Sequence, residues 1–213
     1  MSNKGKKNVI CPHCKKNFEA DFWTVVRGDL DFELKEMIIN GEFDLLLCPE
    51  CGKIFSYEDT FVYLDPGCEI MAFVLPEKER GGQMIEKVMA DYDMIKGSAT
   101  REGALAFKPY YFFGADDLAQ LLLNDRDIEE ETEVMEFMAS EEGYSKKEIR
   151  KSLAREKDLL FSLPYEGANC TISSAISACV GILSKNDRLK RLSKLADFLH
   201  SLKEEEFTSI FRK

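Results

Sequence analysis

Two short cysteine motifs constrain the fold of this chain more than any other feature of its sequence. The motifs CPHC, at residues 11–14, and CPEC, at residues 48–51, each place two thiols three positions apart. On a tight turn such a pair can aim both sulfurs at one ion, and two such turns complete a tetrahedron. The sequence therefore predicts one metal site whose ligands are Cys11, Cys14, Cys48 and Cys51.

Four thiolate ligands favour structural zinc, with iron as the alternative. Both metals accept tetrahedral sulfur, and CPECG resembles the second cysteine motif of rubredoxins, so an electron-transfer protein stays open. A thioredoxin-like dithiol would begin a helix after a strand, a context that neither pair has. Since four thiolates close the coordination shell, we expect no hydrolytic chemistry here. His13 lies between two ligands, where a side chain normally points away from the metal, and is not expected to be a ligand.

The first part of the chain has the pattern of a β-rich module with one inserted helix. Phe18, Ala20 and Phe22 alternate with polar neighbours, which is typical of a strand. Apolar residues recur at helical spacing over residues 31–40, and Gly41 follows as a stop. The other expected elements are a hairpin-like segment at 9–24, strands at about 42–47, 60–64 and 69–75, and a tight turn at 65–67.

The rest of the chain predicts helices. The segment PEKERGGQ, at residues 76–83, combines Pro, paired Gly and alternating charge, and marks a boundary. Strands first and helices second indicate an α+β fold, with a zinc-ribbon-like β module at residues 1–76 and a helical domain at residues 77–213. The expected helices cover about residues 83–95, 115–123, 128–142, 145–160, 168–183 and 187–202.

The cysteine motifs and their surroundings resemble the CpXC proteins, a bacterial family named for these motifs. The resemblance covers roughly residues 8–140 and includes FVYLDPGCEIMAFVLP and YYFFGADDLAQLLLNDRDIEEETEVMEFM. Within the second segment, NDRD at residues 124–127 resembles the family's aspartate-rich turn. The resemblance implies a zinc-ribbon-like module with an attached helical region and no established biochemical activity.

The balance of charge restricts the classes of partner. The formal net charge is −10, and residues 1–76 and 77–213 each hold five more acidic than basic residues. Because cations that displace counterions on phosphates supply nonspecific affinity, a uniformly acidic chain disfavours nucleic-acid binding. A zinc-ribbon nucleic-acid binder stays as an alternative, since cations and aromatic rings lie near the motifs: Lys15, Lys16, Lys53, Phe22 and Trp23.

The sequence shows no apolar run as long as a signal peptide or a transmembrane helix. We therefore expect a soluble, cytoplasmic protein without a membrane partner. Seven cysteines without an export signal argue for reduced thiols and metal ligation rather than disulfides. Cys68, Cys170 and Cys179 are expected to be structural, and the last two, nine apart on a predicted helix, face opposite sides and cannot share one ion.

The charged clusters of the second part are interpreted as structural. Asp116 and Asp117 are expected to cap a helix rather than act in acid–base catalysis. Residues 125–142 are expected to form the solvated face of a helix whose core face holds Val134, Met135, Phe137 and Met138. The basic segment 185–194 is expected to pack its leucine stripe against the helical domain or another subunit.

Signals of enzymatic activity are missing from the sequence. A catalytic triad would have to use His200, and nothing frames that residue as a base. The segment ERGGQM lacks the lysine and spacing of a phosphate-binding loop. We expect a non-enzymatic protein with structural Zn²⁺, whose helical half contacts an unknown protein partner or mediates self-association. The alternatives are a rubredoxin-like iron electron-transfer protein and a zinc-ribbon nucleic-acid binder.

Overall fold

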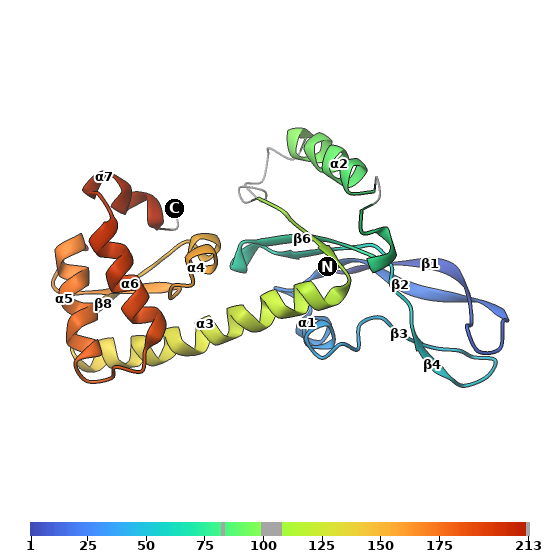
Figure 1. The fold of residues 1–213 in the computed structure, drawn as a ribbon, viewed down its shortest axis with the longest axis horizontal. Coiled ribbons are helices and arrows are strands. Elements are labelled where there is room, and N and C mark those ends of the chain that lie inside the picture. Colours follow the sequence, from blue (N-terminus) through green and yellow to red (C-terminus); the bar gives the residue numbers. More distant parts are fainter. Residues whose placement is uncertain (82–83, 99–107, 212–213) are drawn as a thin grey trace. The chain divides into compact units, whose positions relative to one another are not determined.

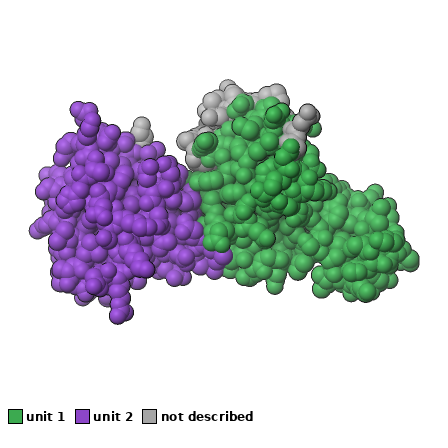
Figure 2. All heavy atoms as spheres, viewed as in Figure 1, with its two compact units in different colours: residues 1–122 green, residues 123–213 purple. Residues whose placement is uncertain are grey.

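The chain mixes strands and helices and divides into two compact units. A computed structural model describes residues 1–81, 84–98 and 108–211, so Gly82 and Gln83 of the expected boundary segment lie outside the described residues. The first unit is Met1–Leu122 and the second is Leu123–Lys213, coloured separately in Figure 2. The α+β class is confirmed, with the four cysteines on the N-terminal β part and helices dominating the C-terminal part.

A five-stranded sheet forms the centre of the first unit (Figure 1). Its order is β1-β2-β5-β6-β7. The strands β1 and β2 pair antiparallel, as do β5 and β6, whereas the β2–β5 and β6–β7 pairs are parallel. The strand bounds are β1 Asn3–Ile10, β2 Asn17–Arg27, β5 Phe61–Asp65, β6 Ile70–Leu75 and β7 Tyr110–Phe113.

Helices cover both faces of this sheet. In Figure 1, helix α1 (Phe32–Ile39) lies below the sheet and helix α2 (Met84–Ser98) lies above it. Because side chains alternate along a strand, β5 and β6 supply one set of core residues to each face. The α1 face, which the start of α3 (Ala115–Glu141) also covers, buries Leu34, Ile38, Phe61, Tyr63, Ile70, Ala72, Val74, Leu118 and Leu122. The α2 face buries Met71, Phe73 and Tyr92.

The expected turn and helix stop are both present. Asp65 accepts a hydrogen bond from the Cys68 backbone N–H at 2.9 Å, and the turn between β5 and β6 contains the 3-10 segment Pro66–Cys68. Helix α1 ends before Gly41, whose φ of 70° is the left-handed conformation that favours glycine. A second 3-10 segment, Glu77–Glu79, follows β6.

The structure corrects two expectations about the middle of the chain. The β part does not end at residue 76, because β7 adds four aromatic residues beside β6. The boundary between the two units therefore falls after Leu122, inside α3, rather than between residues 76 and 77. The physical reason is that β7 and the first turns of α3 supply core to the sheet of the first unit.

The second unit combines helices with a two-stranded sheet. Its elements after α3 are β8 Ser145–Glu148, α4 Lys151–Lys157, β9 Ser162–Tyr165, α5 Ile172–Leu183, α6 Lys190–Ser201, α7 Glu204–Phe207 and the 3-10 segment Thr208–Ile210. Its core buries Ile128, Met135, Ala139, Ile149, Leu160, Leu163, Cys179, Ile182, Leu192, Leu195, Leu199 and Phe207, among others. Thr171 caps α5 by accepting a hydrogen bond from the Ser174 backbone N–H at 3.1 Å.

Three expectations about the second unit are wrong. The helices expected at 115–123 and 128–142 are one continuous helix, α3, so NDRD at 124–127 is helical and not a turn. The helix expected at 145–160 is split into strand β8 and the short helix α4. Strand β9, which no pattern indicated, pairs antiparallel with β8. Among the described residues, no helix is both long and apolar enough to cross a membrane.

Candidate metal centre

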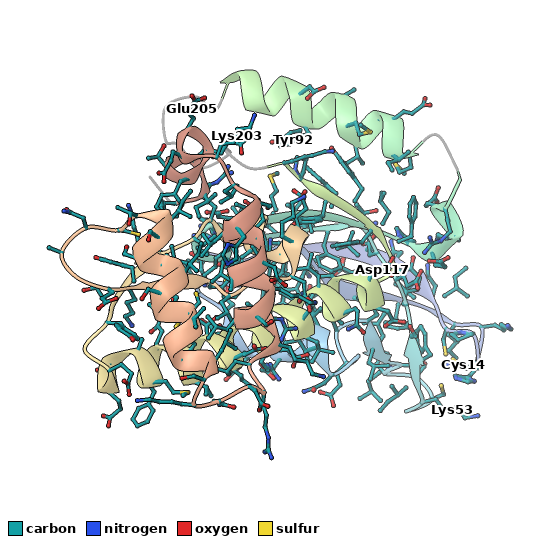
Figure 3. All side chains as sticks on the ribbon, turned by 60° about the vertical axis from the view of Figure 1, so that its left-hand side comes forward. Cys14, Lys53, Tyr92, Asp117, Lys203 and Glu205 are labelled. Carbon is teal, nitrogen blue, oxygen red and sulfur yellow. The ribbon has the colours of Figure 1, made fainter. Side chains whose placement is uncertain are left out.

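Two hairpin turns present the four cysteines. The first motif is the turn between β1 and β2, and the second is the turn between β3 (Leu45–Leu47) and β4 (Ile54–Ser56). Both turns have the same backbone hydrogen bond. The Cys11 N–H donates to the Lys16 carbonyl at 2.9 Å, and the Cys48 N–H donates to the Lys53 carbonyl at 3.0 Å. The two turns lie side by side in Figure 3, where Cys14 marks the first turn and Lys53 marks the second.

The residue after each motif turns the backbone in the same unusual way. Lys15 has φ of 62° and Gly52 has φ of 68°, both in the left-handed region. Their N–H groups donate to the carbonyls of Cys11 at 3.0 Å and Cys48 at 2.9 Å. The second motif uses the residue type that this conformation favours, whereas the first forces a lysine into it.

The four sulfurs lie as close together as the ligands of one metal ion. The Sγ atoms of Cys11 and Cys51 are 3.8 Å apart, those of Cys14 and Cys48 are 3.7 Å apart, and all four lie within 4.8 Å of one another. A tetrahedron with Zn–S bonds of 2.3 Å has edges of about 3.8 Å. The cluster is therefore able to hold one metal ion. Within the described residues it is the one group of three or more ligand side chains found at such spacing.

The thiols of the cluster differ in acidity. Desolvation opposes ionisation of the buried Cys11 thiol, but hydrogen bonds from backbone N–H groups and neighbouring thiols lower its pKa to about 6. A backbone hydrogen bond favours the Cys51 thiolate, but desolvation and the other three thiols raise its pKa to about 11. The first proton therefore leaves readily and later ones do not. A cation at the centre removes this penalty, since it compensates four adjacent negative charges.

Aromatic rings join the two hairpins. Phe55 of β4 meets Phe18 of β2 edge-on, with ring centroids 6.3 Å apart, and Phe22 lies 5.2 Å from Tyr57. The ring of His13 meets the same Phe55 edge-on at 6.5 Å. His13 is not part of the ligand cluster. Its side chain instead packs against the opposite hairpin.

The other cysteines lie away from this cluster. Cys68 lies in the β5–β6 turn and packs against the core of the first unit. Cys179 is buried in α5, where desolvation raises its pKa to about 12. Desolvation also raises the pKa of Cys170. Both side chains pack in or against the core of the second unit.

The acidic helix is only partly as expected. Met135 is buried and Met138 packs against the core, but Val134 and Phe137 are 46% and 69% exposed, so the expected core face is wrong for these two. Asp116 and Asp117 lie in the first turn of α3, at the expected position. A buried polar face, which the pattern did not indicate, runs along the same helix and includes Asp125 and Thr132.

A buried ion pair explains one of these polar positions. Both carboxylate oxygens of Asp125 accept hydrogen bonds from Arg155 of α4, each at 2.7 Å. The two side chains are 8% and 6% exposed. The expected aspartate-rich segment therefore holds α4 against α3, a role that lies outside the metal centre.

The basic segment packs as expected within its own unit. Its leucine stripe enters the core through Leu189, Leu192, Leu195 and Leu199. Arg191 is paired with Glu131 at 3.2 Å and with Asp158 at 2.8 Å. Lys185 and Lys194 also pair with acidic side chains. Most of the local positive charge is therefore compensated.

Comparison with known protein families finds a match over the region that contains the two cysteine hairpins. A family model described as CpXC protein matches residues 9–138, more than half of the chain. The chain belongs to the CpXC family. The match contains both CpXC motifs, the five-stranded sheet from the end of β1 onward and most of α3. A search of curated proteins and a search of solved structures returned no significant match.

Proposed function

We propose that this CpXC protein is a non-enzymatic zinc protein in which Zn²⁺ joins two hairpins and thereby fixes a surface for protein–protein interaction or self-association. The clustering of the sulfurs of Cys11, Cys14, Cys48 and Cys51, all within 4.8 Å of one another, carries the proposal. With four thiolates bound, zinc keeps no coordination position for water or substrate, which supports a structural role.

The small size of the second hairpin supports a folding role for the metal. Strands β3 and β4 have three residues each and form a separate two-stranded sheet. Such a hairpin is marginally stable in water without further contacts. Its links to the β1–β2 hairpin are the aromatic rings described above and an ion pair between Lys16 and Glu50 at 2.6 Å. Metal binding adds the strongest of these links.

An exposed apolar face on the same hairpin supports the interaction role. Leu47 lies opposite Ile54 in the β3–β4 register, and Leu45, two residues from Leu47, points to the same face. These side chains are 62%, 63% and 46% exposed, respectively. Large apolar residues grouped on one face mark an interaction surface more often than isolated ones do. We call Leu45, Leu47 and Ile54 the hairpin face.

The nucleic-acid alternative has less support from the side chains that it would use. Phe22 is buried and is not accessible for base stacking. The ammonium of Lys4 covers the ring of Trp23 at 4.3 Å. Lys16 is paired with Glu50. Stacking and phosphate contacts would therefore have to displace existing interactions.

Metal analysis of purified protein tests the zinc assignment. We expect about one zinc per chain in the wild type and in Cys68→Ser, a matched control outside the cluster, and a nearly complete loss in Cys48→Ser. Chelation should accelerate amide hydrogen exchange over residues 45–56 first. Stoichiometric iron with visible absorption would instead assign the electron-transfer alternative. A folded wild type without bound metal would refute the proposal.

The interaction role is tested at the hairpin face. Leu47→Ser should reduce self-association in sedimentation velocity, or reduce recovery of a specific partner from the native host. Val180→Ser, which removes a comparably exposed apolar side chain from α5, should leave both unchanged. Equal behaviour of the two variants would remove the hairpin face as the interaction surface.

A further inference from the structure

The second unit contains a cavity that neither the metal centre nor the hairpin face accounts for. Its volume is about 220 Å³, and it lies between α3, the paired strands β8 and β9, and the start of α4. Its floor consists of Thr132, Ile149, Phe161 and Ser162, all nearly buried. The cavity is smaller than a typical drug-sized site, and its size suits a single side chain or a small aliphatic ligand.

Hydrogen bonds within the chain fix the polar atoms of this floor. The Thr132 hydroxyl donates to the Ile128 carbonyl at 2.7 Å and accepts from the Phe161 N–H at 3.1 Å. The Ser162 hydroxyl donates to the Glu136 carboxylate at 2.8 Å. The polar atoms of the floor are therefore already paired, and the ring of Phe161, which is 6% exposed, is the apolar surface that remains for a ligand.

Carboxylates surround the opening. Glu129, Glu133, Glu136 and Glu148 line the cavity, against Lys151 as the cation among its lining residues. Glu136 also pairs with Lys146. In the part of the chain that the structure describes, Glu133 and Glu148 form no ion pair, and both are exposed. The cavity thus combines an apolar floor with uncompensated negative charge at its rim.

The position of Lys151 shows that the cavity places a cation beside an aromatic ring and a carboxylate. Its ammonium lies 4.9 Å from the centroid of the Phe161 ring and 3.9 Å from the Glu129 carboxylate. An aromatic face and a carboxylate together stabilise an organic cation. A second cation on an aliphatic stem would find the same ring and the free carboxylates of Glu133 and Glu148.

We propose that this cavity binds the side chain of a lysine or an arginine in a basic peptide segment. The aliphatic stem packs against Phe161, and the ammonium or guanidinium group lies between Glu133 and Glu148. A free diamine shares this chemistry, so the experiment distinguishes the two sources.

Calorimetric titration of the full chain with short blocked peptides tests the assignment. The probes are acetyl-Gly-Lys-Gly-amide, acetyl-Gly-Arg-Gly-amide, the neutral acetyl-Gly-Gln-Gly-amide and 1,5-diaminopentane. At low ionic strength, we expect saturable binding of a basic peptide, no binding of the neutral peptide, and weakening as salt is added. The double variant Glu133→Gln/Glu148→Gln should raise Kd at least tenfold. Glu141→Gln, which removes an exposed carboxylate elsewhere on α3, should change Kd less than twofold.

The outcomes separate the possibilities. Saturation by the diamine but by neither peptide overturns the peptide as the occupant and assigns the site to free amines. Equal weakening by Glu141→Gln overturns the cavity, because nonspecific attraction to an acidic chain explains such a result. Absence of saturable binding by all three cationic probes, with folding verified by circular dichroism, overturns the proposal.

Discussion

The buried ion pair of the second unit allows a prediction whose magnitude follows from geometry. Asp125→Asn keeps the shape of the side chain but removes the charge that faces Arg155. Both hydrogen bonds are 2.7 Å long, and Arg155 is 6% exposed, so its buried guanidinium would lose the carboxylate that accepts both hydrogen bonds. Breaking such a pair costs about 3–5 kcal/mol, a large part of the stability of a small unit.

The assay has to report on the second unit itself. The single tryptophan, Trp23, lies in β2 of the first unit, so its fluorescence is unsuitable. Amide hydrogen exchange of the full chain, followed by mass spectrometry on peptides from α5 and α6, measures the opening free energy of the second unit directly. We expect protection of these peptides to fall by a factor on the order of 100 or more in Asp125→Asn.

Two variants test the reasoning behind this value. Asp127→Asn removes an exposed carboxylate two positions away and should change the opening free energy by less than about 0.5 kcal/mol. The double variant Asp125→Leu/Arg155→Met replaces the pair by apolar side chains and should recover most of the loss. If Asp125→Asn behaves like Asp127→Asn, the pair is not the stabilising contact described here.

Three further predictions concern the first unit. Gly28→Ala should destabilise it by about 3 kcal/mol, because the new Cβ would lie 1.9 Å from the hydroxyl of the buried Tyr63. Urea unfolding followed by Trp fluorescence measures this loss, and an unchanged midpoint would contradict the contact. Burial, with three neighbouring carboxylates, raises the pKa of Asp44 to about 6, so this group contributes stability at low pH that is lost as pH rises through about 6. Asp44→Asn should therefore raise stability at pH 7 by on the order of 1 kcal/mol after solvent screening and flatten the pH dependence between about 4 and 6, measured by urea unfolding at each pH. Lys15→Gly relieves the strain of the left-handed backbone and should raise the free energy of unfolding of the metal-loaded protein by about 0.5 kcal/mol, measured by thermal unfolding. A lower free energy of unfolding would show that the lysine side chain stabilises the fold by more than its backbone strain costs.

The parts of the fold predicted from sequence are those with local signals. The cysteine spacing, the stop at Gly41 and the turn at Asp65 each depend on a few adjacent residues. Strand β7 depends instead on pairing with β6 across a long connection, so its aromatic residues, Tyr110 to Phe113, alone did not identify it. Four consecutive aromatic residues are typical of a strand, so this run before Gly114 is a local signal for β7, although it does not show which strand β7 pairs with.

Helix α3 shows why the spacing of apolar residues did not predict the full length of the helix or its core face. Its buried face carries Asp125 and Thr132 among apolar residues, so the apolar pattern is interrupted where the helix itself continues. The interruption divided one helix into two and moved the expected core face toward Val134 and Phe137. Both polar side chains are satisfied by partners about 30 residues away, Arg155 and the backbone of Phe161. No local pattern contains that information.

The second cysteine hairpin is anchored to the sheet at both of its ends. The chain leaves the sheet after Arg27, forms α1 and the β3–β4 hairpin, and returns at Phe61 as β5, which lies parallel to β2. Both turns therefore stay tethered within a small volume with or without an ion, and bringing the two pairs of thiols together is an intramolecular step. The pairing of the five strands does not pass through the four cysteines, so we expect the sheet to persist when a metal is removed.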